Sequence, residues 1–481
     1  MLTRLRVKGF KNLKDVDLSF GPFTCIAGRN GVGKSNVFDA IAFLSDLASM
    51  PLIKAATRVR GAEDRIAGIE SLFARGPDGD DRRIEFRVDM IVPGEVTDDF
   101  ERPAVPRATY LQYALSLRYD PISAGADKDP IYIEREDLVA KPSSEAAASL
   151  TFRPGKAWVK RHVRGPGSRH APFINTSAAQ DPAESAIQLH GEGKGGRPSA
   201  VPARHSPQTV LSGVNTSSYP TALAARREMQ SWRLLQLEPS ALRLADEFRG
   251  ESQISATGRH LPNALLRTGQ GALVTERLSE LIPGILAVDV DSDKTRQSRT
   301  LKVTMKDRQP YAASSLSDGT LRFLALAVLA SDPLAGGLTC LEEPENGIHP
   351  LRIPQMLTLV RDLADIDGGV DEGSESKDRP PPIRQVIINT HSPIVVADLP
   401  DTDLLMAETV RERGREWVNF RPLPGTWRAA GLPPTDLIAR GELEAYLGGP
   451  SRVRHNAVSA APRCVAQRLV DWDQPDLFAR P

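Results

Sequence analysis

Apolar and polar side chains alternate through residues 2–20, with a polar interruption at 11–14. Alternation of this kind is typical of strands with one buried face, and the interruption predicts a turn between two strands. Two further runs, 84–90 and 111–119, alternate in the same way. The sequence therefore predicts an antiparallel sheet that has one face toward the core and one toward solvent.

Three shorter runs are apolar almost throughout, and they predict buried strands at 23–27, 338–341 and 386–388. Residues 322–330 are also apolar on nearly all sides, and this segment predicts a buried helix. The remaining regular patterns are helical at 219–235 and 272–282 and alternating at 285–290 and 301–305. Strands and helices of both kinds in one chain indicate an α/β protein.

Residues 140–216 interrupt this regularity, because they are rich in Pro, Gly, Ser and His and contain only scattered apolar residues. Between positions 152 and 204 there are nine Lys or Arg residues and three acids. Such a composition cannot bury much apolar surface, which favours a poorly ordered surface insertion. The alternative is a contact for nucleic acid or a partner, assisted by Phe152, Trp158 and Phe173.

The overall composition restricts the classes of function. Lys plus Arg and Asp plus Glu both total 61, so no global charge draws the chain onto nucleic acid or an anionic membrane. Cys25, Cys340 and Cys464 have neither disulfide nor metal-site spacing, as expected in a reducing cytosol. The chain contains no run of 18 apolar residues, and its N-terminus lacks the apolar core of a signal peptide. We expect a cytoplasmic protein with no membrane contact.

The segment from Gly28 to Ser35 reads G-R-N-G-V-G-K-S and fits the phosphate-binding motif G-x-x-x-x-G-K-[ST]. A predicted strand precedes it and a helical pattern follows it, which is the context that the motif requires. Glycines allow the backbone to approach phosphates closely, and the helix N-terminus presents its N–H groups to them. Lys34 is expected to reach the β- and γ-phosphates, and the Ser35 hydroxyl is expected to bind Mg²⁺. The predicted nucleotide ligands are Gly28, Asn30, Gly31, Gly33, Lys34, Ser35 and Asn36.

Two consecutive acids, Glu342 and Glu343, end the predicted strand at 338–341. This is the Walker B arrangement, in which the first acid orients Mg²⁺ and the second polarises the attacking water. Glu342 stands where aspartate is more usual. Glu345 is assigned to the following turn and not to a second base.

Two further motifs follow a similar logic. Ser317 and Gly319 precede the predicted buried helix within L-S-D-G-T, where a serine cap and a glycine suit a phosphate at a helix start. His391 ends the strand at 386–388, which we expect beside the Walker B strand, so its imidazole can reach the γ-phosphate. Taken alone, each motif also fits a purely structural role.

In this order, the four motifs resemble those of ATP-binding-cassette (ABC) ATPase heads. The segments G-F-K-N-L-K, L-S-D-G-T-L-R-F-L, E-E-P-E-N-G-I-H-P and N-T-H-S-P are most similar to the RecF/SMC/OLD branch, and within it to defence-associated predicted ATPases of the AAA-21 type. The resemblance covers roughly 1–120 and 220–422. It implies a P-loop NTPase fold with a mixed central sheet, an antiparallel β subdomain and a helical subdomain.

The resemblance also implies a head-to-tail homodimer, or a higher oligomer of dimers, with each ATP between one chain's P-loop and the other's signature. Ser317 and Gly319 would then touch the partner's ATP. It further implies that Glu343 is the general base, that His391 is the switch histidine, and that Asn346 and Gly347 form the loop crossing the dimer. The cofactors would be ATP and Mg²⁺.

We divide the chain accordingly into five segments. They are an N-terminal ATPase lobe (1–139), a basic insertion (140–216), a helical subdomain (217–300), a C-terminal ATPase lobe (301–422) and a tail of unknown role (423–481). A transporter motor is disfavoured, because the signature follows the P-loop at a much greater distance than in transporters. The absence of sustained heptads argues against SMC arms. No arginine-finger context supports a ring ATPase.

Two hypotheses remain. In the first, the ATPase senses nucleic acid or a foreign signal and controls a separate effector, often a nuclease, in antiphage defence. No acidic nuclease cluster is recognisable after His391, so the nuclease would be another chain. In the second, the protein is a RecF-like repair ATPase that binds DNA directly. The neutral charge and the large insertion favour the first hypothesis, whereas a salt-sensitive DNA affinity would favour the second.

Overall fold

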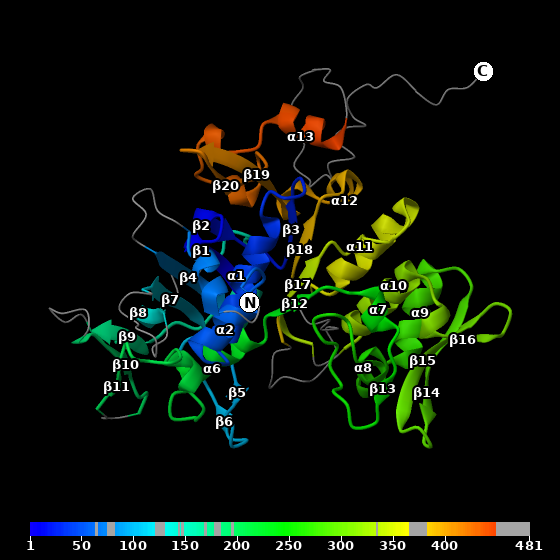
Figure 1. Cartoon of the computed structure of the whole chain (residues 1–481), viewed down its shortest axis with the longest axis horizontal. Coiled ribbons are helices and arrows are strands. Elements are labelled where there is room, and N and C mark those ends of the chain that lie inside the picture. Colours follow the sequence, from blue (N-terminus) through cyan, green and yellow to red (C-terminus); the bar gives the residue numbers. More distant parts are fainter. Residues whose placement is uncertain are drawn as a thin grey trace.

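The computed structural model describes residues 1–62, 66–74, 82–120, 130–142, 145, 149–167, 171–177, 184–193, 197–332, 335–364 and 382–448. Two large sheets, two smaller sheets and two groups of helices make up this part of the chain (Figure 1). Most of the acid-rich segment 362–378 and the end of the tail, with Cys464, lie outside it. None of the described helices is long and apolar enough to cross a membrane.

The central sheet has six strands in the order β12-β17-β18-β3-β19-β20. Their bounds are Arg233–Leu235, Gly337–Glu342, Arg384–Thr390, Phe23–Ala27, Leu404–Glu412 and Arg415–Pro422. All neighbours run parallel except β20, which pairs with β19 in the antiparallel direction. The sheet is therefore mixed, and the three apolar runs predicted as buried strands are its adjacent strands β17, β18 and β3.

Alternate residues of these strands belong to two separate hydrophobic cores. On β3, Ile26 lies in the first core, whereas Cys25 and Ala27 lie in the second. On β18, Ile387 and Ile388 divide in the same way. Parallel strands covered on both faces need apolar residues at nearly every position, which explains the continuous apolar runs.

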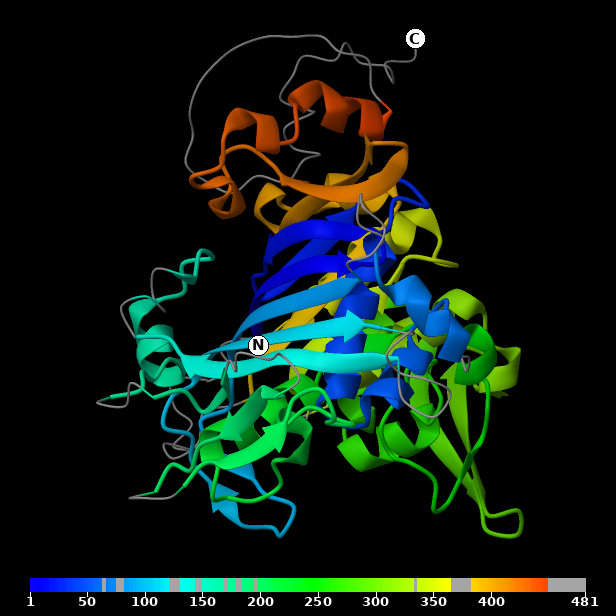
Figure 2. The same cartoon turned by 60° about the vertical axis from the view of Figure 1, so that its left-hand side comes forward.

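The second sheet is antiparallel and has eight strands in the order β11-β10-β9-β8-β7-β4-β1-β2 (Figure 2). Their bounds are Ser199–Pro202, Ala186–Leu189, Ile174–Ser177, Ile131–Ala140, Tyr110–Tyr119, Arg83–Ile91, Leu2–Phe10 and Leu13–Ser19. The predicted strands at 2–20, 84–90 and 111–119 are thus confirmed as β1, β2, β4 and β7. Helix α1, Lys34–Leu47, packs into the first core together with residues from these strands.

The segment 140–216 differs from the poorly ordered loop that its composition favours. Its described residues include helix α5, Lys156–His162, and the strands β9, β10 and β11, which extend the antiparallel sheet. Trp158, Phe173 and Ile187 are buried. These few apolar side chains are enough to order β9, β10 and β11, because the edge of β8 offers unpaired backbone groups to which the next strand can hydrogen-bond. The division into five segments stays a prediction.

Helix α6, Pro220–Gln230, packs into the first core and not with the later helices. The helical pattern at 219–235 extends too far, because the chain turns after α6 and enters strand β12. Around the second core lie α7 Pro239–Leu242, α8 Leu261–Thr268, α9 Gly271–Leu281, α10 Asp318–Ala330, α11 Ile353–Asp362 and α12 Pro393–Asp398. The predicted buried helix at 322–330 is confirmed as part of α10.

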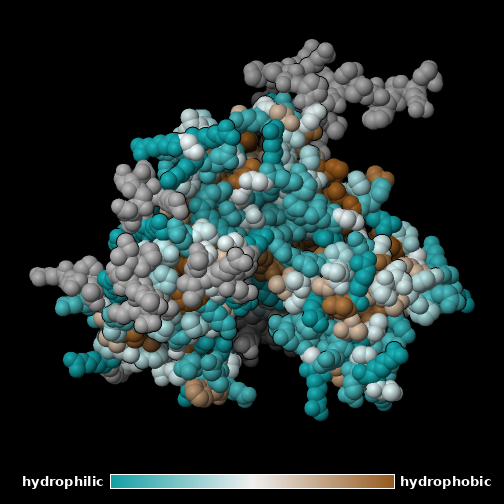
Figure 3. All heavy atoms as spheres, in the orientation of Figure 1, coloured by the Kyte–Doolittle hydropathy of each residue, from teal (hydrophilic) through white to brown (hydrophobic). Residues whose placement is uncertain are grey.

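A smaller sheet accompanies these helices, so the region from 217 to 300 is not purely helical. It contains β13 Asp246–Glu247, β14 Ile285–Asp293, β15 Ser298–Met305 and β16 Pro310–Ala312. Short elements elsewhere are α2 Leu52–Arg58, η1 Ile66–Leu72, the β5–β6 hairpin of Val96–Thr97 and Pro103–Ala104, η3 Leu211–Gly213 and α13 Arg440–Leu447. The face of the molecule in Figure 3 is mostly hydrophilic, with small hydrophobic patches over the helical side.

Candidate functional site

The loop between β3 and α1 has the backbone geometry that its glycines predict. Gly33 has φ 108° and immediately precedes α1, and a Cβ atom at this position would lie 2.2 Å from the Asn12 amide. A Cβ atom on Gly28 would lie 2.5 Å from the Ala407 carbonyl oxygen. No other residue fits either position without displacing backbone or the Asn12 side chain.

Lys34 opens α1 and is buried beneath the loop. Its Nζ donates hydrogen bonds to the carbonyl oxygens of Gly28, at 2.7 Å, and Arg29, at 2.8 Å. Burial lowers the pKa of Lys34, against the opposing effect of the nearby Glu343 and Glu345 carboxylates. The ammonium is therefore held in place by groups that an anionic phosphate can replace at little cost.

Asn12 supports the loop from the turn between β1 and β2. Its amide nitrogen donates to the Val32 carbonyl at 3.0 Å, and its oxygen accepts from Asn36 Nδ2 at 2.7 Å. The sequence places Lys11–Lys14 in a turn but contains no signal for this contact, which forms only when β1 and β2 pack beside the P-loop.

The two Walker B acids lie at the end of β17, and β18 is its parallel neighbour as predicted. Glu343 has φ 41°, a conformation uncommon outside glycine, and its N–H donates to Asn389 Oδ1 at 2.9 Å. One carboxylate oxygen of Glu343 lies 2.8 Å from His391 Nδ1, and the other accepts from Asn346 Nδ2 at 2.7 Å. The structure thus brings together Glu343 and Asn346 of the acid-pair segment and His391 of the N-T-H-S-P segment.

Glu342, by contrast, is bound by two residues that the sequence does not single out. Arg60 donates to both of its carboxylate oxygens, at 2.9 and 2.7 Å, and Gln236 donates to one of them. The same guanidinium donates to Asp39 at 2.7 Å. Arg60 follows α2 and Gln236 follows β12, so these contacts depend entirely on tertiary folding.

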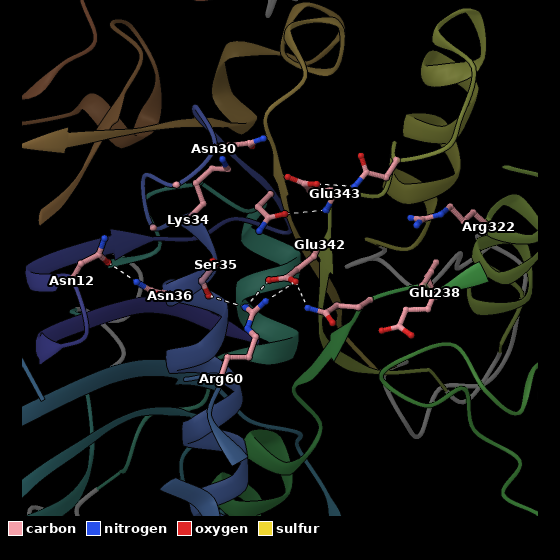
Figure 4. A pocket seen from close by; sticks show the side chains of 16 residues that line it. Asn12, Asn30, Lys34, Ser35, Asn36, Arg60, Glu238, Arg322, Glu342 and Glu343 are labelled. Atoms are coloured by element: carbon pink, nitrogen blue, oxygen red, sulfur yellow. Dashed lines mark hydrogen bonds and ion pairs between the residues drawn. The ribbon is translucent and has the colours of Figure 1, made fainter. Parts of the chain in front are cut away.

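These groups line one cavity of about 550 Å³, a size that suits a small ligand (Figure 4). Its walls contain the predicted residues Asn30, Gly31, Gly33, Lys34, Ser35, Asn36, Glu342 and Glu343. They also contain Asn12, Arg60, Gln236, Leu237, Glu238, Arg322, Asn346 and Asn389. Gly28 and His391 do not line the cavity, but His391 contacts Glu343, which does.

The signature residues lie elsewhere. Ser317 caps α10 by accepting a hydrogen bond from the Thr320 N–H at 3.2 Å, and it is exposed. Gly319 packs on the following loop, where an added Cβ atom would lie 3.0 Å from the Gly347 carbonyl oxygen. Neither Ser317 nor Gly319 lines the cavity of its own chain.

Glu345 occupies a different environment from its two neighbours. It is buried, does not line the cavity, and accepts a hydrogen bond from the Thr390 hydroxyl. Burial raises its pKa above the ordinary glutamate value. These contacts agree with a role in the turn between β17 and α11.

The cavity fits a nucleotide with a magnesium ion on the chemistry of its donors. Space is open beside Gly31, where an added Cβ atom would meet nothing within 4 Å. Ser35 and Glu342 both face the cavity. Among the described residues, no group of three or more His, Cys, Asp or Glu side chains could hold a metal by itself. Magnesium commonly takes only one or two protein ligands and completes its shell with phosphates and water.

Two family profiles match the sequence. Residues 209–397 match the AAA-21 family, described as "AAA domain, putative AbiEii toxin, Type IV TA system", and residues 1–59 match the RecF/RecN/SMC N-terminal domain. Together they contain the P-loop, the signature, the acid pair and His391.

Among individual proteins, the DNA replication and repair protein RecF of Anaeromyxobacter dehalogenans is 25% identical over 363 residues, which are 70% of this chain and 91% of that protein. The OLD nuclease of Thermus scotoductus is 54% identical over 41 residues, or 8% of each chain. RecF of Phocaeicola vulgatus is 41% identical over 46 residues, 9% of this chain and 12% of that protein. The chain thus spans most of the first relative and only a short part of the other two.

Among solved structures, the SmcHead bound to the C-winged helix domain of ScpA is similar with a TM-score of 0.42 and 15% identity, covering 88% of this chain and 98% of that one. The SMC head domain from Thermotoga maritima has a TM-score of 0.35 and 13% identity, with the same coverage.

Proposed function

We propose that this chain, which belongs to the RecF/SMC/OLD branch of the ABC-class ATPases, binds ATP with Mg²⁺ in the cavity and hydrolyses it. One observation carries the proposal: the P-loop lysine after β3 and the acid pair at the end of β17 face the same cavity from the two strands that flank β18 in the central sheet. A structural glycine turn needs neither a buried lysine nor two carboxylates opposite it.

Each residue has a distinct role in this proposal. Lys34 and the loop N–H groups bind the phosphates, and Ser35 with Glu342 hold Mg²⁺, which neutralises phosphate charge. Glu343 orients a water molecule and accepts its proton. His391 and Asn346 hold the Glu343 carboxylate at the cavity wall, each through one of its oxygens.

We further infer that the active form is a head-to-tail homodimer. Ser317 and Gly319 lie outside the cavity of their own chain, and Ser317 is exposed at the start of α10. A second copy can therefore receive these groups, as expected for a composite site. The dimer explains why a phosphate-binding helix start lies away from the P-loop.

For the output of the cycle we propose control of a separate effector, a nuclease being the first candidate, in antiphage defence. The AAA-21 match and the short OLD nuclease match support this function. The second candidate is a RecF-like ATPase that acts directly on DNA. It is supported by the alignment that spans 91% of one RecF.

Nucleotide binding by the purified chain tests the proposed chemistry. Lys34→Ala removes the cation beneath the P-loop, and we expect ATP affinity to fall at least about tenfold, since a charge-assisted contact to phosphate is lost. Lys8→Ala serves as the control, because Lys8 forms a surface ion pair with Asp15 on the antiparallel sheet. Absence of ATP binding and hydrolysis by the unmodified chain would refute the proposal.

Two measurements separate the candidate outputs. Co-purification from the native host identifies a stably bound effector, and ATP hydrolysis is then measured with and without DNA. Stimulation by DNA in the isolated protein, with binding that weakens steeply as salt rises, supports the RecF-like function. An effector whose activity follows the ATP state supports the first function.

A further inference from the structure

Arg322 is a charged residue of the cavity to which none of the four motifs assigns a role. It lies on α10, one turn after the signature, and its side chain extends from this helix toward the cavity (Figure 4). Within the part of the chain that the structure describes, Arg322 has no hydrogen-bond or ion-pair partner. Its Nε atom is buried without an acceptor.

The second arginine of the cavity provides a contrast. Arg60 is saturated, because its guanidinium contacts Glu342 and Asp39. The charges of Asp318, Glu343 and Glu345 raise the pKa of Arg322, but none of these acids forms an ion pair with it among the described residues. Asp318 instead pairs with Arg243 at 2.5 Å, and Glu343 is held by His391 and Asn346.

An unpaired guanidinium in such a place is costly. Burial lowers the pKa of Arg322, since the charged form loses hydration that no protein acceptor replaces. Arg322 is half-buried and its Nε has no acceptor, so an oppositely charged ligand in the cavity can supply the missing partner. The cavity already contains Lys34 for phosphate, so the same anion can satisfy both cations.

Helix α10 connects Arg322 to the signature residues. The helix begins at the Ser317 cap, packs through Gly319 on the loop of Gly347, and is buried on nearly all sides from Leu321 onward. A helix fixed in this way moves as one body. Arg322 and the signature residues must therefore shift together.

We propose that Arg322 binds the terminal phosphate of the ATP held by its own chain, and that α10 thereby links occupancy of one site to presentation of Ser317 and Gly319 to the other. This inference rests on the proposed ATP binding and on the composite dimer. It assigns Arg322 as a ligand of the γ-phosphate in cis. It also supplies a physical path between the two sites of the dimer.

The test measures ATP and ADP affinities of the full chain in a Ser317→Arg background, which blocks the composite site and leaves only the contacts within one chain. Arg322→Gln should lower ATP affinity about tenfold or more and change ADP affinity little, because ADP lacks the contacted group. The ATP affinity of Arg322→Lys should lie between that of the Ser317→Arg parent and that of Arg322→Gln. Lysine keeps the positive charge but lacks the planar pair of N–H donors with which a guanidinium binds phosphate. Arg243→Gln, an arginine that contacts Asp318 outside the cavity, should leave the ratio of the two affinities unchanged.

The thermal midpoint of the nucleotide-free chain separates ligand binding from a structural role. Because Arg322 has no partner among the described residues, Arg322→Gln should not lower it. Equal ATP affinities of the Ser317→Arg parent and its Arg322→Gln derivative would overturn the inference and leave the proposed function intact. If Arg322→Gln lowers ATP affinity only in the chain that keeps Ser317, the contact lies across the dimer and the cis assignment is refuted. Failure of the unmodified chain to bind ATP at all would overturn both the inference and the proposed function.

The link through α10 has its own measurement in the chain with an intact signature. At saturating ATP, Arg322→Gln should dimerise more weakly than the unmodified chain by sedimentation velocity. Dimerisation that is identical at saturation would show that α10 does not carry the signal.

Discussion

Glu343 has a backbone conformation that few residues other than glycine adopt, and three contacts hold it there. Its N–H donates to Asn389, and its carboxylate contacts His391 and Asn346. Strained geometry that is supported on every side is characteristic of catalytic positions. The carboxylate is thus oriented before a nucleotide binds.

Glu343→Gln should retain this geometry and remove the base. We expect ATP binding to persist while hydrolysis falls by roughly 10²–10⁴-fold, as for other losses of general-base catalysis, so that a dimer with bound ATP accumulates. Phosphate release and size-exclusion chromatography with light scattering provide the measurements.

Glu345→Gln is the matched control, because Glu345 is the same residue type two positions away but does not line the cavity. Its effect should fall on thermal stability more than on turnover. Normal hydrolysis by Glu343→Gln would instead transfer the role of base to Glu342 or Glu345.

At the same scale, the sequence predicts the residues of the motifs better than it predicts the residues that position them through contacts. Lys34, Ser35, Glu342 and Glu343 belong to local motifs with defined spacing, and all four line the cavity. Arg60 carries no local signal, because its contact with Glu342 joins positions 282 residues apart. Contacts of this kind arise from packing and have no signature within a short window of sequence.

Among the structural elements, η3 is hydrogen-bonded to the antiparallel sheet through a buried carboxylate. Glu136 on β8 accepts from the N–H groups of Val210 and Leu211 at 2.7 and 2.9 Å, and from the Tyr113 hydroxyl at 3.1 Å. Burial raises the pKa of Glu136 to about 7, although these three hydrogen bonds lower it. This carboxyl group is fully buried and therefore prefers to carry its proton in the folded chain.

The raised pKa predicts a stability that depends on pH with a defined sign. In the folded protein Glu136 binds a proton below about pH 7, whereas in the unfolded chain it does so only below its ordinary value of 4.5. The favourable contribution of Glu136 to the free energy of unfolding is complete below pH 4.5 and is lost as pH rises through 7. The total loss is about 3 kcal/mol. The thermal midpoint of the unmodified chain should therefore exceed that of Glu136→Gln, and this difference should be larger at pH 5.5 than at pH 8.

Glu136→Gln is expected to be less stable at both pH values, because its amide NH₂ would face a backbone N–H. Tyr113→Phe is the control: it keeps the carboxyl group and removes one of the hydrogen bonds that lower the pKa of Glu136, so the loss of stability with rising pH should persist and move to higher pH. A difference between Glu136→Gln and the parent that does not change with pH would contradict the assigned pKa.

The same elements show where sequence patterns are informative. Strands β1, β2, β4 and β7 have clear alternation and were predictable. Strands β9, β10 and β11 have four residues each, which is too short for a period to be distinguished from composition. They form because β8 offers an edge and because Phe173 and Ile187 find a core that the rest of the sheet has already built.

At the scale of the whole molecule, the separation of the signature from the cavity makes the dimer testable without a structure of it. A Lys34→Ala chain lacks a working P-loop, and a Ser317→Arg chain lacks a working signature. In a head-to-tail dimer of one chain of each kind, one site combines both defects, and the other combines the two intact halves. Random mixing in equal amounts should therefore restore about a quarter of the normal number of sites.

We expect each variant alone to be nearly inactive and the mixture to recover part of the ATPase activity. The matched control is a mixture of Lys34→Ala with Glu343→Gln. Both defects then lie on the P-loop side of the composite site, so every arrangement contains at least one defect per site and activity should stay low. Native mass spectrometry confirms that mixed dimers form. Recovery in the first mixture but not in the second requires that Ser317 act on the nucleotide of the other chain, whereas equal results in the two mixtures, with mixed dimers present, would place each complete site within one chain.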